Sequence, residues 1–185
     1  MENKVKFEQY KKLLCEWSSR MNLVAPSTLN DIDNRHIADS AQLADFLPKN
    51  TDIIDLGSGA GFPGVVLAIM GWNVTCIESI GKKVSFLTEV KKQLNLGNLT
   101  IYHGRVEDYI AKLDLSQKYV FTARAFAPLI KILDYVHKTK YELFLLKGRD
   151  IMTEVDTAKR KYHFGFELFP SKTGDGFIIN VKKSR

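Results

Sequence analysis

A run of closely spaced glycines is the part of this sequence whose residue types are best suited to holding a ligand. Gly57, Gly59 and Gly61 follow the strand-like residues 52–56, and Pro63 comes soon after them. Glycine allows sharp turns and a close approach of the backbone to a ligand, while proline suits the first turn of a helix. The run therefore predicts a ligand-binding loop between a strand and a helix.

The spacing of these glycines distinguishes between two classes of cofactor. A dinucleotide loop has the spacing G-x-G-x-x-G, whereas Phe62 occupies the place of the last glycine and the loop reads G-x-G-x-G. That second form is typical of methyltransferases that bind S-adenosylmethionine. Glu78 ends the next predicted strand about 20 residues later, where a carboxylate can accept hydrogen bonds from both hydroxyls of a ribose. We therefore expect S-adenosylmethionine as the cofactor and disfavour a nicotinamide oxidoreductase. The residues expected to bind it here are Gly57, Ser58, Gly59 and Glu78.

Two later segments are placed to complete such a site. Val106 and Glu107 follow the predicted strand 99–103, and backbone groups of this pair are expected near the adenine. Glu107 also suits the first turn of a helix, where the helix dipole favours a carboxylate. Arg124 ends the fourth predicted strand, and open α/β sheets bind ligands at the carboxyl ends of their strands. We expect Arg124 to hold the carboxylate of the cofactor or a phosphate of the substrate.

Composition and charge limit the class of protein. The chain has 185 residues, a net charge of +6 and two cysteines, with no CxxC or His/Cys cluster. Its longest apolar run, residues 65–70, is far shorter than the roughly 20 residues of a membrane span. We expect a cytoplasmic, monomeric, single-domain protein without a metal site. The positive charge favours a partner that carries phosphates, such as RNA.

The hydrophobic pattern predicts the elements that must position these residues. An amphipathic helix over 3–20, a loop over 22–28 and a second helix over 29–47 form an N-terminal helical extension, residues 1–50. Strands and helices then alternate through the remaining residues, 51–185. The predicted strands are 52–56, 73–77, 99–103, 119–122, 142–146, 164–169 and 176–182, and the predicted helices are 64–70, 82–94, 106–112, 129–138 and 151–161. This layout is the α/β class I methyltransferase fold: Rossmann-like, with seven mostly parallel strands and an antiparallel C-terminal strand.

Motifs that run in order from residue 17 to residue 148 resemble those of one enzyme family. They are Trp17…Asn22-Leu23, Arg35-His36-x-x-Asp39-Ser40, the Asp55–Gly64 loop, Glu78-Ser79…Lys82-Lys83…Phe86-Leu87, Arg105-Val106-Glu107, Arg124-Ala125-Phe126-Ala127 and Leu146-Lys147-Gly148. The most specific are Arg-His-x-x-Asp-Ser and Gly-x-Pro-Gly. On these motifs the chain resembles the small-subunit ribosomal RNA methyltransferase G family, also called glucose-inhibited division protein B. The C-terminal residues carry weaker signatures of it.

The resemblance implies a reaction, a partner and residue roles. The reaction is methylation of N7 of one guanine in 16S ribosomal RNA, in the assembled or assembling small subunit. Residues that would line the cofactor site are Gly57, Phe62, Val106, Glu107 and Arg124. Residues expected on the RNA or substrate side are Arg35, His36, Lys82, Lys83 and Lys147, and the matching Asp39 and Ser40 have no assigned role. For His36 we favour a hydrogen-bonded residue that holds the N-terminal layer to the sheet over a catalytic base.

The proposed reaction needs no catalytic base. Guanine N7 has an in-plane lone pair and no proton, so holding the reactants in line lowers the barrier and no catalytic residue is expected. Phe62 and Phe126 are candidates for stacking on a base that leaves its helix. Two alternatives stay open: a small-molecule methyltransferase of the same fold, and a non-catalytic RNA-binding module.

Overall fold

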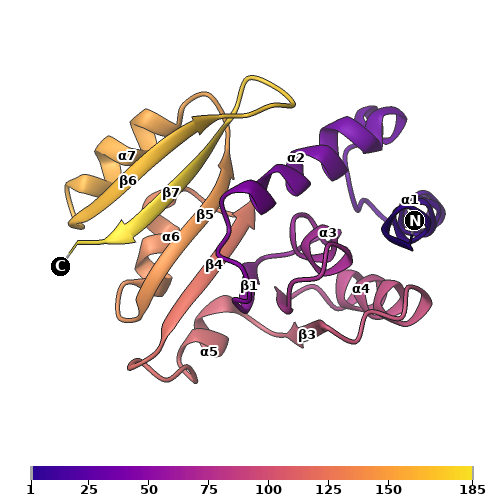
Figure 1. Cartoon of the computed structure of the whole chain (residues 1–185), viewed down its shortest axis with the longest axis horizontal. Coiled ribbons are helices and arrows are strands. Elements are labelled where there is room, and N and C mark those ends of the chain that lie inside the picture. Colours follow the sequence, from indigo (N-terminus) through magenta and orange to yellow (C-terminus); the bar gives the residue numbers. More distant parts are fainter. Residues whose placement is uncertain (1, 185) are drawn as a thin grey trace.

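A seven-stranded sheet is the centre of the computed structural model, which describes residues 2–184. Its strands lie in the order β3-β2-β1-β4-β5-β7-β6. Their bounds are β1 Ile53–Leu56, β2 Val74–Glu78, β3 Leu99–His103, β4 Lys118–Arg124, β5 Lys140–Lys147, β6 Phe164–Pro170 and β7 Phe177–Lys183. All seven predicted strands are present, with ends that move by up to two residues. Figure 1 shows the sheet with the last two strands at one edge.

The direction of the strands shows at which end of the sheet a ligand would bind. This end, where the parallel strands have their carboxyl ends, is called the carboxyl edge. β3, β2, β1, β4 and β5 are parallel, and β7 is antiparallel to both β5 and β6. The parallel strands therefore end at one edge of the sheet, and Lys147 at the end of β5 pairs with Phe177 at the start of β7. The loop between β6 and β7 returns to this same edge. The predicted class I methyltransferase fold is thus confirmed in its seven mostly parallel strands and its antiparallel C-terminal strand.

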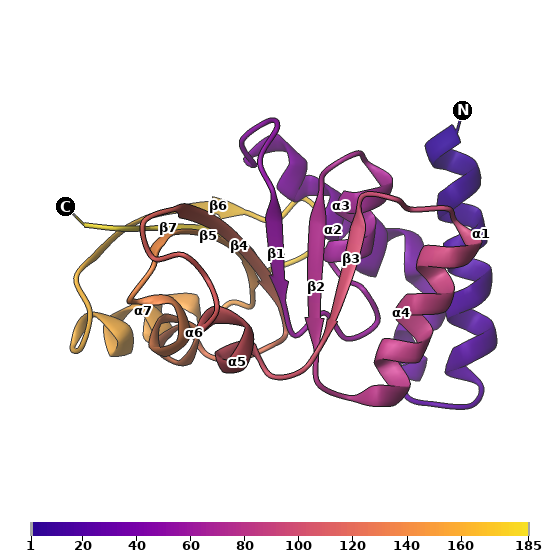
Figure 2. The same cartoon turned by 90° about the horizontal axis from the view of Figure 1, so that it is seen from below.

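Helices cover both faces of the sheet and bury two apolar cores (Figure 2). One face is covered by α1 Glu2–Ser18, α3 Gly64–Ile69 and α4 Gly81–Gln93 together with residues 26–45. The other face is covered by α5 Val106–Ile110, α6 Leu129–Val136 and α7 Ile151–Lys159. The strands between the two edges, β2, β1, β4, β5 and β7, are buried on both sides by this arrangement, which explains their apolar runs, whereas the edge strands β3 and β6 are only partly buried.

The second predicted helix, 29–47, differs from an ordinary α-helix. Its place is taken by η1 Pro26–Asp31 and η3 Gln42–Asp45, which are 3₁₀ helices, η2 Asp33–Ala38, a π-helix, and the single turn α2 Asp39–Ala41. The backbone angles at the junctions, such as φ −58° and ψ −39° at Ile32, stay right-handed helical. The segment is therefore one helical run whose hydrogen-bond spacing changes along its length. It begins three residues earlier than predicted, inside the expected loop 22–28.

None of the described helices has the length and apolar character needed to cross a membrane. Residues 2–184 also contain no group of three His, Cys, Asp or Glu side chains arranged to hold a metal ion.

Candidate active site

The glycine loop joins β1 to α3 in a conformation that only glycine adopts easily. Gly57, Gly59 and Gly61 have φ angles of 65°, 58° and 95°, in the left-handed region that costs other residues energy. Ser58 is buried, and its hydroxyl donates to the Asp55 carbonyl at 3.1 Å. The Ser58 side chain therefore holds the loop together from inside.

Glu78 fastens the glycine loop to the loop after β2. Its Oε2 accepts a hydrogen bond from the Gly59 amide at 2.8 Å, and its Oε1 accepts one from the Ile80 amide at 2.8 Å. Glu78 as a whole residue is 5% exposed. Each carboxylate oxygen can accept a second hydrogen bond, so Glu78 keeps acceptor capacity toward a ligand while it orders both loops.

Two further buried residues stabilise the glycine loop, and the sequence alone predicted no role for either. Asp55 is fully buried; Thr122 Oγ1 and the Gly64 amide donate to its carboxylate at 3.1 and 3.2 Å. Burial raises the pKa of Asp55 to about 6. Tyr10 on α1, also fully buried, donates its hydroxyl to the Ala60 carbonyl at 2.5 Å. The only sequence signals were an acidic residue at the start of the glycine motif and an aromatic residue on the buried face of the first helix.

A cavity of about 290 Å³ opens beside this loop. It brings together residues predicted to form the site, which come from the loop after β1, the end of β2, and the starts of α4 and α5: Gly57, Glu78, Lys83, Val106 and Glu107. Val106 is buried and Glu107 is exposed. We refer to this space as the loop cavity.

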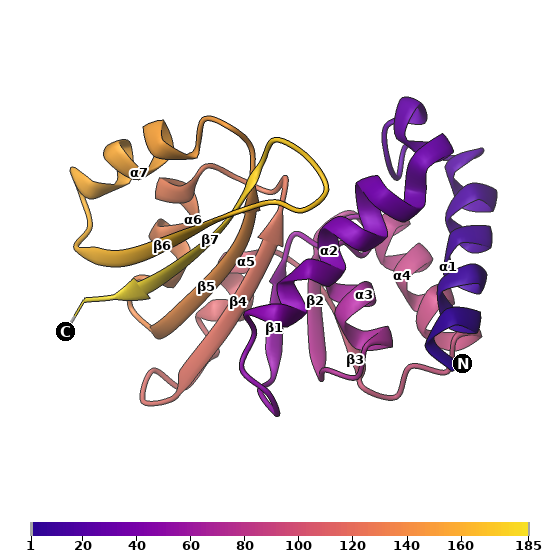
Figure 3. The same cartoon turned by 45° about the horizontal axis from the view of Figure 1, so that its top comes forward.

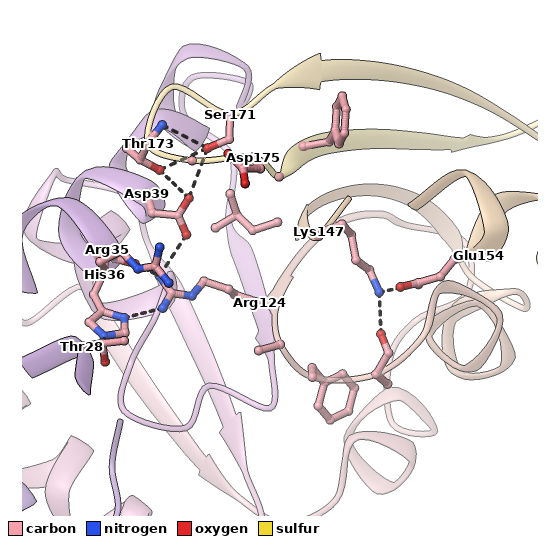
Figure 4. A pocket seen from close by; sticks show the side chains of 18 residues that line it. Thr28, Arg35, His36, Asp39, Arg124, Lys147, Glu154, Ser171, Thr173 and Asp175 are labelled. Atoms are coloured by element: carbon pink, nitrogen blue, oxygen red, sulfur yellow. Dashed lines mark hydrogen bonds and ion pairs between the residues drawn. The ribbon is translucent and has the colours of Figure 1, made fainter. Parts of the chain in front are cut away.

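A second cavity of about 570 Å³ lies at the carboxyl ends of β4 and β5 (Figure 4). Its walls come from the helical run 26–45, the ends of these two strands, α7 and the β6–β7 loop. The charged and imidazole side chains in its lining include Arg35, His36, Asp39, Arg124, Lys147 and Glu154. We refer to this space as the strand-end cavity. Ala125 and Phe126 line both cavities.

Phe126 separates the two cavities. A β-carbon built on Gly57 would lie 2.1 Å from Cδ2 of the Phe126 ring, so this ring lies directly against the glycine loop. Ala125 before it has a φ angle of 50°, an uncommon value for a residue with a side chain. The turn after β4 therefore directs an aromatic ring to the boundary between the cavities.

Arg124 connects the sheet to the helical run. Its Nη1 donates to Asp39 Oδ2 and to the Arg35 carbonyl, each at 3.0 Å, and its Nη2 contacts His36 Nδ1. Its guanidinium also lies 5.3 Å from the centre of the Phe62 ring. Arg124 lines the strand-end cavity, not the loop cavity, and much of its hydrogen-bonding capacity is used within the protein.

His36 has both ring nitrogens in hydrogen bonds. Since a guanidinium can only donate, Nδ1 must accept from Arg124, and Nε2 must then carry the proton. Nε2 lies 2.8 Å from Thr28 Oγ1, which in turn donates to the Ala25 carbonyl at 2.7 Å. Burial, reinforced by Arg124 and Arg35, lowers the pKa of His36 to about 4. The imidazole is therefore neutral at pH 7 and holds the N-terminal segment to the sheet.

Phe62 packs against the ring of His36 and lines neither cavity. Its ring is buried, with centroids 4.9 Å from His36 and 5.4 Å from Tyr10. Gly59 and Ser58 likewise do not line the loop cavity, although the Gly59 amide is bound to Glu78. Sequence reasoning thus placed Phe62 at a ligand site, whereas the structure gives it packing contacts.

The cationic side chains predicted to meet RNA fall into two groups. Arg35 and Lys82 are exposed, and Lys83 is half-buried at the rim of the loop cavity. Lys147 differs, because its side chain is only 10% exposed and its Nζ donates to Glu154 Oε2 at 2.7 Å and to the Ala127 carbonyl at 2.6 Å. Lys147 therefore lines the strand-end cavity and is not a surface cation.

The β6–β7 loop contributes residues to the lining of the strand-end cavity and lies beside α2 of the helical run (Figure 3). Asp39 Oδ1 accepts hydrogen bonds from Thr173 Oγ1 and from Gln42 Nε2, each at 2.9 Å. The Lys172 amide donates to Gln42 Oε1 at 2.9 Å. Ser40, beside Asp39, is fully buried, and its Oγ has no hydrogen-bond partner among residues 2–184.

Comparison with known proteins identifies close relatives of the sequence. A family model described as rRNA small subunit methyltransferase G (GidB) matches residues 3–171. A protein of Bartonella tribocorum named Ribosomal RNA small subunit methyltransferase G is 38% identical over 187 residues, covering 97% of this chain and 85% of the relative. A protein of the same name from Caulobacter vibrioides is 40% identical over 185 residues, covering 95% of this chain and 82% of the relative.

Solved structures support the same fold at much lower sequence identity. A SAM dependent methyltransferase from Aquifex aeolicus superposes with a TM-score of 0.61 at 13% identity, covering 86% of this chain and 99% of that one. The glycopeptide N-methyltransferase MtfA, complexed with S-adenosylmethionine, has a TM-score of 0.61 at 11% identity, covering 80% of this chain and 94% of that one.

Proposed function

Because the chain belongs to the rRNA small subunit methyltransferase G family, we propose that it transfers a methyl group from S-adenosylmethionine to N7 of a guanine in 16S ribosomal RNA. The observation that carries this proposal is the position of the two cavities, which share Ala125 and Phe126 at the carboxyl edge of the sheet. One cavity suits the cofactor and the other suits a base, so the two reactants would meet beside Phe126.

The residues of the loop cavity fit S-adenosylmethionine. The Glu78 carboxylate has acceptor capacity for the ribose hydroxyls, and backbone groups at Val106 and Glu107 lie where an adenine would be held. The glycine loop would receive the amino-acid end, since its backbone allows a close approach. When bound, the cofactor supplies an electrophilic methyl group.

The protein's own contribution is positioning. Guanine N7 carries no proton, so no side chain has to remove one, and orientation can lower the barrier by about 7–11 kcal/mol. His36 is neutral and bonded at both nitrogens, which suits a role in holding Arg124 and the cavity wall. The strand-end cavity of about 570 Å³ is large enough for one base turned out of its stack, and Phe126 offers a ring for stacking.

The partner is ribosomal RNA, in the assembled or assembling small subunit. Arg35, Lys82 and Lys83 would contact its phosphates, because they come from the helical run 26–45 and the first turn of α4, at the edge that carries both cavities. We place the protein in the cytoplasm, where ribosomes assemble, and propose that it acts as a monomer.

Two measurements test the proposal together. Calorimetry should show binding of S-adenosylmethionine and no response to NAD, and mass spectrometry of ribosomal RNA nucleosides should show 7-methylguanosine lost when the gene is removed. Cofactor binding with unchanged RNA nucleosides would favour a small-molecule methyltransferase. RNA binding without cofactor binding would favour a non-catalytic module.

A further inference from the structure

The walls of the strand-end cavity differ in how much hydrogen-bonding capacity they have left. On the side of the helical run, both oxygens of Asp39 and the Nη1 of Arg124 are already used within the protein. The hydroxyls of Thr28 and Ser171 are also bonded to protein groups. Apart from Arg35, whose exposed guanidinium can only donate, this wall has little left with which to recognise a base.

The opposite wall keeps one free donor beside one free acceptor. Lys147 has three N–H donors, of which two are used by Ala127 and Glu154. Glu154 Oε2 accepts from Lys147 at 2.7 Å and from the Leu129 amide at 2.6 Å, while no hydrogen bond reaches its Oε1 from any residue between 2 and 184. The Glu154 side chain is 30% exposed and lines the cavity (Figure 4). A donor and an acceptor thus stand side by side.

We propose that the Lys147–Glu154 pair recognises the target guanine by its Watson–Crick edge, with Lys147 donating to O6 and Glu154 Oε1 accepting from N1–H. This inference rests on the proposed N7 methylation. A guanine whose N7 faces the cofactor has O6 next to N7 and N1–H beyond it, on the side away from the methyl group. Cytosine offers the same adjacent donor and acceptor when it pairs with guanine. Adenine has the reverse pattern at these two positions, so the pair would reject it.

The contacts of Glu154 make one substitution a sharp test. In Glu154→Gln, the amide oxygen must stay at the Oε2 position, because Lys147 and the Leu129 amide both donate there. The amide NH₂ then replaces Oε1 and presents a donor to guanine N1–H, which is also a donor. The variant should therefore methylate guanine poorly but still methylate a purine whose N1 is an acceptor. 2-Aminopurine is such a base: it keeps N7 and lacks both O6 and the N1 proton.

The experiment measures single-turnover methylation of ribosomal RNA that carries either guanosine or 2-aminopurine at the mapped target position. The wild-type protein should prefer guanosine. Glu154→Gln should slow guanosine methylation by about 10- to 100-fold, the range for a lost hydrogen bond to a charged group. It should leave the 2-aminopurine rate unchanged or raise it. The ratio of the guanosine rate to the 2-aminopurine rate should therefore fall sharply. Simple loss of folding cannot produce this effect, because it would lower both rates equally.

Asp134→Asn is the matched control, because Asp134 forms an ion pair of the same kind with Lys161 at 2.7 Å, also beside α6 and α7, but outside both cavities. It should leave both rates unchanged. A guanosine preference that persists in Glu154→Gln, with or without slower turnover, would overturn the inference and leave the proposed function intact. Failure of the wild-type protein to methylate guanine N7 would instead contradict the proposed function.

Discussion

The role of a single residue at this site depends on which of its donors and acceptors are already bonded within the protein. Glu78 orders two loops and retains acceptor capacity, whereas Arg124 and Asp39 are bonded mainly to the protein itself. The sequence predicted that Glu78, Val106 and Glu107 would lie together, because strand ends meet at one edge in this fold. It could not predict that Lys147 would be paired with Glu154, since the partner lies on a helix whose packing decides the contact.

The close contact between Gly57 and Phe126 gives a prediction for cofactor affinity. Gly57→Ala should weaken S-adenosylmethionine binding by at least about tenfold, because the new methyl group would overlap the Phe126 ring and sit on a backbone with φ 65°. Gly71→Ala is the control: its φ is 108°, yet no atom lies within 4 Å of the new methyl group. Calorimetry should find normal affinity in Gly71→Ala. Equal affinities for both variants would place the cofactor away from the loop.

His36 gives a prediction for stability against pH. Its pKa is about 4 in the folded protein and 6.5 in the unfolded chain, so the unfolded chain takes up a proton first as pH falls. The contribution of His36 is therefore complete above pH 6.5 and is lost between 6.5 and about 4. Asp55, whose pKa is raised to about 6, acts in the opposite direction, with stability lost as pH rises through 6.

The difference in unfolding free energy between the wild type and His36→Gln isolates the His36 contribution. The contribution of Asp55 cancels in this difference, because both proteins contain Asp55. In urea unfolding, the free-energy difference between the two proteins should be smaller at pH 5 than at pH 7.5 by about 1–2 kcal/mol. An equal difference at both pH values would mean that His36 is not neutral and bonded as described.

At the scale of elements, the helical run 26–45 is the part whose form was least predictable. Its apolar spacing correctly predicted a helix, but not the π and 3₁₀ spacing within it. That spacing accompanies contacts of Asp39 and His36 with Arg124, which is 85 and 88 positions away in the chain. Local sequence carries no signal for such contacts. The central strands were predictable because burial on both faces requires apolar runs.

The contact between this run and the β6–β7 loop gives a prediction for stability. Asp39→Asn should lower the free energy of unfolding by about 1.5–3 kcal/mol, since it weakens charge-assisted bonds to the partly buried Arg124 and to Thr173. Asp45→Asn removes an exposed ion pair with Lys172 and should cost less than about 1 kcal/mol. Thermal or urea unfolding distinguishes them. Similar losses in both variants would show that Arg124 does not anchor the helical run.

At the scale of the whole molecule, the exposed cations Arg35 and Lys82 and the two adjoining cavities lie at the carboxyl ends of the parallel strands. Exposed Arg35 and Lys82 flank the cavities, while Lys118 lies at the start of β4, on the opposite edge, and pairs with Glu142. If RNA binds over the cavities, Lys82→Ala should lower the slope of log affinity against log salt by about one unit. Lys118→Ala should leave that slope unchanged. The reverse result would move the RNA surface to the other edge.

The most direct test of the account is the chemical identity of the methylated product. Purified protein, S-adenosylmethionine and small-subunit ribosomal RNA, free or in subunits, should yield 7-methylguanosine at one position. Because that base is cationic, borohydride and aniline should break the RNA chain there and nowhere else. The rate of the single-turnover reaction should stay nearly flat between about pH 6.5 and 8.5, since no general base titrates. A methyl group on an exocyclic nitrogen or a ribose, or a rate that rises tenfold per pH unit, would contradict methylation at guanine N7.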